Sequence, residues 1–246
     1  FLFISSLVLR IPIIIFFGDT NLEYEWLNLV NNLVIHGKLI WQTFDNGFML
    51  PNSWMPPLYA YYLFFFTFFN LEHQNYIILI LFSQIILASL SVVLFYKINQ
   101  NFFGKKISFY SSILFSIFPI HLYASSQISS ISLQTFLTIV FLYLFFLLVK
   151  KKNITSIIFF SITGGLLILL RGEFWFIFFL SLIYLFLFLG ISFKKILLII
   201  LISSITASPY LIRNYLIFEK ITVLQSFGYN LWKGNHPYAK ENSIVE

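Results

Sequence analysis

The sequence has no cysteine and little charge. The absence of cysteine excludes disulfides and thiolate metal sites. Only 10% of the 246 residues are charged, while 59% are hydrophobic, and the mean hydropathy is +0.90. A soluble domain of this size needs far more polar surface, whereas a protein surrounded by lipid does not. We therefore predict an all-α integral membrane protein.

The sequence also lacks the motifs of several function classes. It has no glycine-rich phosphate loop, and its histidines have neither HxH nor HExxH spacing. These histidines, all expected on the outer surface, are His36, His73, His121 and His236. No cofactor and no metal site is indicated, although a divalent metal is not excluded. The net charge of +6 is diluted by apolar sequence, so it does not indicate nucleic-acid binding.

The two ends of the chain lack the features of a complete protein. The sequence begins at Phe1, without Met, inside an apolar run, and it ends at Glu246 in a polar stretch. No small-residue cleavage site follows the first run, so a cleaved signal peptide is not expected. We interpret the sequence as the N-terminal fragment of a longer protein with further spans.

Long apolar runs dominate what is present. A spanning helix needs about 20 mostly apolar residues, and several segments meet or approach this length. They are 1–17, 76–96, 107–122, 132–149, 154–170, 174–190 and 196–212. A shorter run, 57–69, begins with Pro56 and Pro57, which suit a helix N-terminus. We predict a polytopic bundle of about seven spans, with 57–69 lying in the outer interface. Arg10, within the first span, must face protein or extend to the surface.

The lysines indicate the orientation of the bundle. They cluster in alternate connections between the predicted spans, which the positive-inside rule assigns to the cytoplasm. The clusters are Lys97, Lys105 and Lys106; Lys150, Lys151 and Lys152; and Lys194 and Lys195. All nine acidic residues and all five tryptophans then fall outside, provided that 57–69 does not cross. We predict one multi-span domain, 1–212, with an outer loop at 18–75, and the start of a truncated outer loop at 213–246.

Three carboxylates follow the first predicted span, at Asp19, Glu23 and Glu25. Partial burial beside lipid raises the pKa of a carboxyl group and suits it to general-base catalysis. The structural alternative is that Asp19 is the N-cap of a helix through Asn32, whose dipole the two glutamates complement. The sequence favours neither interpretation.

Two arginines stand near the ends of predicted spans, in the segments 170–173 and 209–215. An arginine at the membrane edge is costly unless it reaches the surface or binds an anion. A lipid phosphate lies at this depth, and a guanidinium group can bind it through two hydrogen bonds. The alternatives are that Arg213 extends to the surface and that Arg171 pairs locally with Glu173.

Two further segments have residue types that suit a ligand at the membrane surface. Residues 54–59 combine two prolines with aromatic side chains, which form a rigid corner or a simple interfacial anchor. Residues 228–237 contain amide, aromatic and basic groups in a predicted turn-rich outer loop, a composition that suits sugar binding but is common in loops.

Taken in order, these motifs resemble the GT-C superfamily of polyprenyl-phosphate-sugar transferases, which includes protein O-mannosyltransferases and the aminoarabinose transferases of lipid A. The resemblance covers nearly the whole chain. The matching pieces are Asp19 with Glu23-Tyr24, Asn32-Leu33 with Gly37, Pro56-Pro57-Leu58-Tyr59, Phe103-Gly104-Lys105, and the segments 170–173, 209–215 and 228–235. Two departures stand out. The acid of a Ser-Glu motif before the fourth span is absent from 129–134, and Gly172 replaces the usual proline.

The resemblance implies transfer of a sugar from a polyprenyl-phosphate donor to a glycan, lipid or protein acceptor, with inversion. The reaction would take place at the outer face of a bacterial cell membrane. Asp19 is the favoured base, with Glu23 and Glu25 as substitutes, and Arg171 and Arg213 would bind the donor phosphate. The contacts implied for sugar or lipid are Tyr24, Trp54, Pro57, Tyr59, Asn214, Trp232 and Asn235.

Two other function classes are open on the sequence. One is an O-antigen polymerase or ligase, which would rely on arginines in a late loop outside this chain. The other is a non-enzymatic lipid or solute transporter, which predicts functional charges inside the spans. Apart from Arg10, the predicted spans hold almost no such charges.

Overall fold

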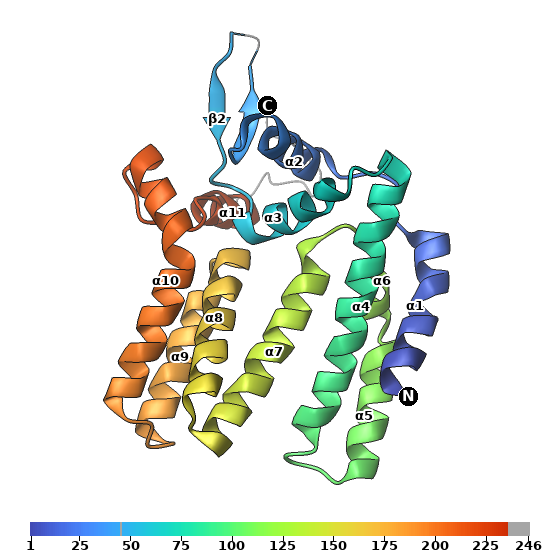
Figure 1. Ribbon diagram of the computed structural model, residues 1–246, viewed down its shortest axis with the longest axis vertical. Coiled ribbons are helices and arrows are strands. Elements are labelled where there is room, and N and C mark those ends of the chain that lie inside the picture. Colours follow the sequence, from blue (N-terminus) through green and yellow to red (C-terminus); the bar gives the residue numbers. More distant parts are fainter. Residues whose placement is uncertain (45, 236–246) are drawn as a thin grey trace.

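The computed structural model describes residues 1–44 and 46–235, and most of these belong to helices (Figure 1). Apolar helices lie side by side as a bundle. They are α1 (Leu2–Phe17), α4 (His73–Asn99), α5 (Lys105–Ile117), α7 (Ser130–Lys151), α8 (Ile154–Leu170), α9 (Phe174–Leu187) and α10 (Phe193–Phe218). Within the bundle, α4 packs against α1, α5 and α7, while α8 packs against α7 and α10.

Glycines allow the close approach of α8 to its neighbours. A Cβ atom at Gly165 would lie 2.8 Å from the carbonyl oxygen of Ser203 in α10. At Gly164 it would lie 2.5 Å from the ring of Phe178 in α9. Small residues at helix contacts are how membrane helices pack closely, since no hydrophobic force drives them together in lipid.

The long connection between α1 and α4 folds over one end of the bundle (Figure 1). It contains α2 (Tyr24–His36), an antiparallel hairpin of β1 (Ile40–Thr43) and β2 (Met49–Pro51), α3 (Pro57–Phe65) and the 3-10 helix η1 (Phe66–Phe69). The helix α11 (Ser226–Asn235) lies at the same end. The buried side of this layer shares one apolar core with the bundle, in which Trp26, Tyr59 and Ile128 are members.

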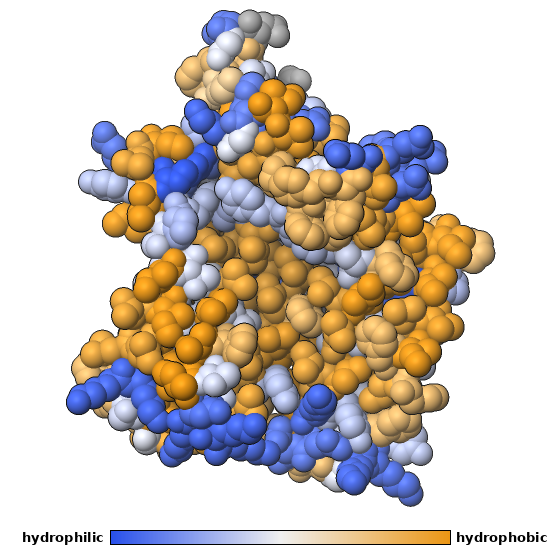
Figure 2. Space-filling model, in the orientation of Figure 1, coloured by the Kyte–Doolittle hydropathy of each residue, from blue (hydrophilic) through white to orange (hydrophobic). Residues whose placement is uncertain are grey.

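The length and composition of the helices are compatible with a helical membrane protein. The helices α4, α7 and α10 are long and apolar enough to cross a membrane, and α1, α8, α9 and the segment Pro57–Phe69 are apolar but shorter. Figure 2 shows an apolar flank over the bundle, with hydrophilic groups gathered at its lower end and a mixed surface above. A helix satisfies its own backbone hydrogen bonds, which is what a lipid environment demands.

The lysine clusters and the described acids lie at opposite ends of the bundle, although Lys38, Lys220 and Lys233 share the end with the acids. The lysine clusters lie where α4 joins α5, α7 joins α8 and α9 joins α10, which is the lower end in Figure 1. The acidic residues of the described part lie in or beside the opposite ends of the helices. They are Asp19, Glu23, Glu25, Glu72, Glu173 and Glu219. Asp45, Glu241, Glu246 and His236 lie outside the described residues.

Several predicted boundaries agree closely with the structure. The segment 154–170 is α8, and 57–69 is α3 together with η1, beginning at Pro57 as expected. The helix α10, which corresponds to the last predicted span, runs on to Phe218, past the predicted end at residue 212. Arg213 therefore lies within a helix rather than at the start of a loop.

The segment 107–122 is not one continuous helix. The helix α5 ends at Ile117, Phe118 is extended with ψ 120°, and the short helix α6 (Pro119–Ala124) follows. Pro119 has no N–H to donate, and its ring disfavours a helical conformation at the preceding residue. His121, expected on the outer surface, instead lines a cavity inside the bundle.

Two further expectations are corrected. The all-α prediction missed the hairpin, whose turn is closed by the Gly47 N–H donating to the Phe44 carbonyl at 2.9 Å, with φ of +79° at Gly47. The predicted turn-rich loop is helical over Ser226–Asn235. Gly228 and Gly234 weaken a helix by about 1 kcal/mol each without forbidding it.

Candidate functional site

Asp19 connects the end of α1 to the loop between α6 and α7. Gly18 ends α1, and the next residue is held by two hydrogen bonds to this loop. The Asp19 N–H donates to the Ser126 carbonyl at 3.1 Å, and the Asp19 Oδ2 accepts from the Ile128 N–H at 2.6 Å. The side chain is half-buried, and among the described residues no hydrogen bond is made to its other carboxylate oxygen.

The interpretation of Asp19 as a helix N-cap is wrong. The helix α2 begins at Tyr24, its N-cap residue is Glu23, and no side chain caps it. Residues 20–23 separate Asp19 from the first turn, so its carboxylate cannot reach the free N–H groups there. Glu25 does lie in the first turn, where a negative charge complements the helix dipole.

Glutamines join the Asp19 segment to the bundle and to α3. The Gln127 side-chain amide donates to the Phe17 carbonyl at 2.8 Å, and the Gln84 amide donates to the Gln127 carbonyl at 3.1 Å. The Tyr59 hydroxyl in turn donates to Gln84 Oε1 at 3.5 Å. The sequence analysis did not single out Gln84 and Gln127. Gln84 could have been noticed as a polar residue in the middle of an apolar run.

Tyr59 lies at the centre of this network. Its side chain is fully buried, and its ring meets Trp26 edge-on with centroids 4.8 Å apart. Burial raises the pKa of Tyr59 well above its ordinary value, and Tyr62, Tyr76, Asp19 and Glu23 add to the shift in that order.

The glutamates are more accessible than Asp19. Glu23 and Glu25 are both exposed. Partial desolvation, and then the charge of Glu23, raise the pKa of Glu25 above its ordinary value. Exposed side chains in mutual repulsion are less confined than Asp19, which the 126–128 loop holds in one place.

Arg171 lies where α8 ends, beside the first turns of α7. Its Nε donates to Gln134 Oε1 at 2.9 Å. In the described part of the chain no ion pair joins it to Glu173, so the local pair considered from the sequence is not formed. The side chain is half-buried, and no hydrogen bond from either Nη group to a described residue is present. Gln134 is the last residue of the segment 129–134, in which the acid of the expected Ser-Glu motif is absent.

Arg213 is bound differently, by backbone carbonyls of the α1–α4 connection that covers one end of the bundle. Its Nη1 donates to the Asn52 carbonyl at 2.6 Å and to Asn214 Oδ1 at 2.7 Å, and its Nη2 donates to the Leu39 carbonyl at 2.8 Å. The guanidinium also lies 5.6 Å from the ring centroid of Tyr210. This side chain joins α10 to the ends of the hairpin, and phosphate binding by Arg213 stays a prediction.

The remaining residues expected to contact sugar or lipid divide by burial. Tyr24 is 70% exposed, Trp54 39% and Trp232 46%, and Asn235 is exposed with its amide donating to the Leu231 carbonyl. Pro57 and Asn214 are buried, like Tyr59, and Asn214 donates to the Thr222 carbonyl at 2.6 Å. Pro57, Asn214 and Tyr59 therefore lie beneath the surface of the protein and do not form part of it.

A surface groove of about 340 Å³ lies between α2, η1 and the beginning of α4. Its walls are apolar at Leu22, Val30 and Tyr76, while Asn31 and His73 add polar groups. The His73 ring also shares a hydrogen bond of 2.9 Å with Asn21 Oδ1. The groove therefore begins in the same 19–23 segment that carries the acidic motif, and its volume suits a small organic ligand.

No group of three or more His, Asp or Glu side chains within residues 1–44 and 46–235 is arranged to hold a metal ion. The chain matches no protein-family model, no curated protein and no solved structure. The function of the chain is therefore inferred from its residues and their geometry.

Proposed function

We propose that this protein transfers a sugar from a polyprenyl-phosphate donor to a glycan, lipid or protein acceptor. The observation that carries the proposal is that Asp19 and Arg171, which are distant in sequence, form hydrogen bonds to the same segment, residues 128–134. Asp19 is bound by the N–H of Ile128, just before α7, and Arg171 is bound by Gln134 in the first turns of α7. A helix rises about 1.5 Å per residue, so both anchors lie at one end of α7.

A carboxylate and a guanidinium at one membrane surface supply the groups that such a transfer needs. The Asp19 carboxylate takes the proton of the acceptor hydroxyl, whose oxygen forms a bond to the anomeric carbon from the face opposite the phosphate. The bond between the anomeric carbon and the phosphate oxygen breaks, and the electron pair leaves with the phosphate. The free Nη groups of Arg171 would stabilise the charge that develops there. Glu23 and Glu25 remain substitutes for the base.

The orientation of the proposed enzyme follows from its charges. With α1, α4, α5–α6, α7, α8, α9 and α10 as seven spans, the lysine clusters would face the cytoplasm by the positive-inside rule. The acidic end would then face the exterior or periplasm of a bacterial cell, with α3 and η1 in the outer interface. A lipid-linked donor needs no nucleotide at that face, in keeping with the absence of a glycine-rich phosphate loop from the sequence.

We assign the groove beside α2 to the acceptor. Amide and imidazole groups on an apolar wall suit a sugar ring, whose hydroxyls form hydrogen bonds while its C–H face contacts apolar surface. The groove and Asp19 belong to the same short segment after α1, so an acceptor hydroxyl there would approach the proposed base from the outer surface.

The test is a comparison of surface glycans and glycolipids by mass spectrometry. The strains are the parent, a deletion, and the deletion expressing the full-length wild-type protein, Asp19→Asn or Glu72→Gln. Glu72→Gln is the matched control, because it removes an acid at the same end of the bundle whose own side chain does not line the groove, although its neighbour His73 does. Membrane abundance is measured by immunoblot in every strain.

Loss of one sugar in the deletion, restored by wild type and Glu72→Gln but not by an abundant Asp19→Asn, would support the proposal and identify the sugar class by mass. Full restoration by Asp19→Asn would remove Asp19 as the base and direct the test to Glu23 and Glu25. No change of any glycan in the deletion, under conditions in which the protein is made, would contradict glycosyl transfer and favour a transporter.

A further inference from the structure

Arg10 is buried inside the bundle rather than at either membrane surface. Its side chain is 1% exposed. Its Nη1 donates to the Ser6 carbonyl at 3.0 Å, to the Ser6 hydroxyl, and to the Ser116 hydroxyl at 3.5 Å. Its Nε has no hydrogen-bond acceptor among the described residues. The side chain therefore faces protein, and its hydrogen bonds go to neutral groups only.

No carboxylate of the described residues pairs with this charge. The described acids lie at the ends of helices, and the nearest along α1, Asp19, is about 13 Å away at a rise of 1.5 Å per residue. Removing an unpaired cation from water costs several kcal/mol, and intramembrane charges almost always have a partner. The guanidinium has a backbone carbonyl and two hydroxyls as partners but no counter-charge, which an anion from another source would supply.

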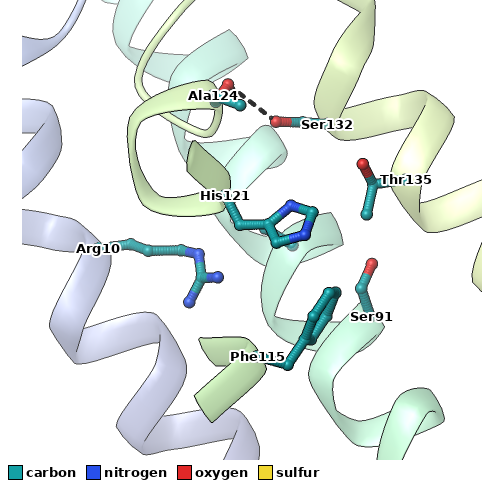
Figure 3. A pocket seen from close by; sticks show the side chains of 8 residues that line it. Arg10, Ser91, Phe115, His121, Ala124, Ser132 and Thr135 are labelled. Atoms are coloured by element: carbon teal, nitrogen blue, oxygen red, sulfur yellow. Dashed lines mark hydrogen bonds between the residues drawn. The ribbon is translucent and has the colours of Figure 1, made fainter. Parts of the chain in front are cut away.

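A small cavity adjoins Arg10 and is lined from several helices. Figure 3 shows the Arg10 guanidinium and the His121 imidazole turned toward the same space, with Phe115, Ser91 and Thr135 around it. The hydroxyls of Ser91 and Ser132 donate to backbone carbonyls at 2.9 and 3.0 Å. The potential donors that remain at the cavity are the Arg10 guanidinium, the His121 imidazole and the Thr135 hydroxyl, a set that suits an acceptor without protons of its own.

The size of the cavity limits what it can hold. Its volume is about 10 Å³, close to the space that a single water molecule needs. A tetrahedral phosphate or a carboxylate carries several heavy atoms and is too large, whereas a chloride ion is a single atom, and the cavity needs only a modest widening to hold it. We infer that Arg10 and His121 form a binding site for one chloride-sized monovalent anion, which neutralises the buried guanidinium. This site is separate from the proposed sugar transfer.

The first test is the thermal stability of the purified full-length protein in sodium chloride and in sodium gluconate at equal ionic strength. Binding to the folded state raises the melting temperature by mass action, and we expect an increase of about 2–4 °C in chloride for the wild type. Arg10→Met should lose this difference. Lys97→Met, which removes a cation at the lysine end of the bundle, should retain it.

The second test does not depend on a variant that folds. Crystals of the wild-type protein grown in bromide should show an anomalous scattering peak between the Arg10 guanidinium and the His121 ring. Equal melting temperatures in the two salts, or the absence of such a peak from crystals with other visible bromide sites, would overturn the inference. Stabilisation by phosphate but not by chloride would also overturn it, since the ligand would then be an oxyanion.

Discussion

The carboxylate of Asp19 and the backbone N–H of Ile128 form a hydrogen bond of 2.6 Å across 109 positions of sequence. A second bond, from the Asp19 N–H to the Ser126 carbonyl, holds the same residue against the same loop. One carboxylate oxygen is thereby held in place while the other faces no described hydrogen-bond donor. A base that must meet a substrate hydroxyl in one orientation benefits from such confinement, since misplacement by about 1 Å can cost a hundredfold in rate.

Replacement of Asp19 separates its structural role from its chemical role. Asp19→Asn keeps an oxygen that can accept from Ile128 but removes the base, so transfer should fall by about 10²–10⁴ with little change in melting temperature. Asp19→Ala also loses a charge-assisted hydrogen bond and should be destabilised by about 1.5–3 kcal/mol. Transfer assays and thermal melts on the same preparations check both. Equal activity of Asp19→Asn and wild type would assign Asp19 to structure alone.

Arg171 should act on the donor phosphate rather than on stability. Arg171→Gln should lower kcat by about 10²–10³, because a positioned donor at the developing charge is lost. Arg171→Lys should recover only part of this, since an ammonium group cannot make the two parallel hydrogen bonds of a guanidinium. Steady-state kinetics with the lipid-linked donor measure the effect. If Arg171→Gln loses stability and keeps its kcat, the side chain serves only to join α8 to Gln134.

Arg213 should show the opposite pattern. Arg213→Met leaves the Asn52 carbonyl without its donor and removes one of two donors to the Leu39 carbonyl, which still accepts from the Asn52 N–H, so it should destabilise the protein by about 1–3 kcal/mol. Arg213→Lys should be intermediate, because one ammonium group replaces a fork that reaches both carbonyls. Thermal melts and the transfer rate of the folded fraction, measured together, distinguish a structural role of Arg213 from phosphate binding. A large loss of rate at unchanged melting temperature would instead favour phosphate binding by Arg213.

Glu25 should make stability depend on pH in one direction. Its pKa in the folded protein is raised, first by desolvation and then by Glu23, so its ionised form is disfavoured by folding. A carboxyl group whose pKa is higher in the folded protein than in the unfolded chain stabilises the fold at pH values below its unfolded pKa. This contribution is lost as the pH rises through the folded pKa. Glu25→Gln should therefore melt at a slightly higher temperature than wild type at neutral pH. The difference should vanish below about pH 4, near the unfolded pKa of glutamate.

A melting series of wild type and Glu25→Gln from acid to neutral pH measures this difference. Glu23→Gln is the matched comparison, because it removes the neighbouring charge and should lower the pKa of Glu25. A variant curve that parallels wild type at every pH would show that folding leaves the Glu25 pKa unchanged.

Much of the fold could be predicted because the responsible signals are local in sequence. Apolar runs located the helices of the bundle, and Pro56 and Pro57 located the start of α3. The break at Pro119 was also readable in principle, since proline restricts the residue before it. The helix at α11 was missed because its glycines resemble turn signals, and helix propensity is only a weak guide against tertiary context.

The candidate site was predictable in residue type but not in arrangement. Asp19 and Arg171 stood out because charges are rare in this chain. Their partners, Ile128 and Gln134, are an apolar residue acting through its backbone and a neutral amide, and neither carries a signal in sequence. Arg213 looked equally suited to phosphate until its guanidinium was found bound to two carbonyls.

The sequence by itself indicated a helical protein compatible with a membrane, with its lysine clusters at one end of the apolar helices and its acids at the other, because hydropathy and charge are properties of each segment alone. Only the tertiary structure decided that Arg10 and His121 line one cavity and that Asp19 binds the Ile128 N–H just before α7. It also decided that Arg213 binds the carbonyls of Leu39 and Asn52 at the ends of the hairpin. These facts depend on which side of each helix meets which neighbour. That choice follows from packing among segments far apart in the chain, where small shifts of a helix change every contact.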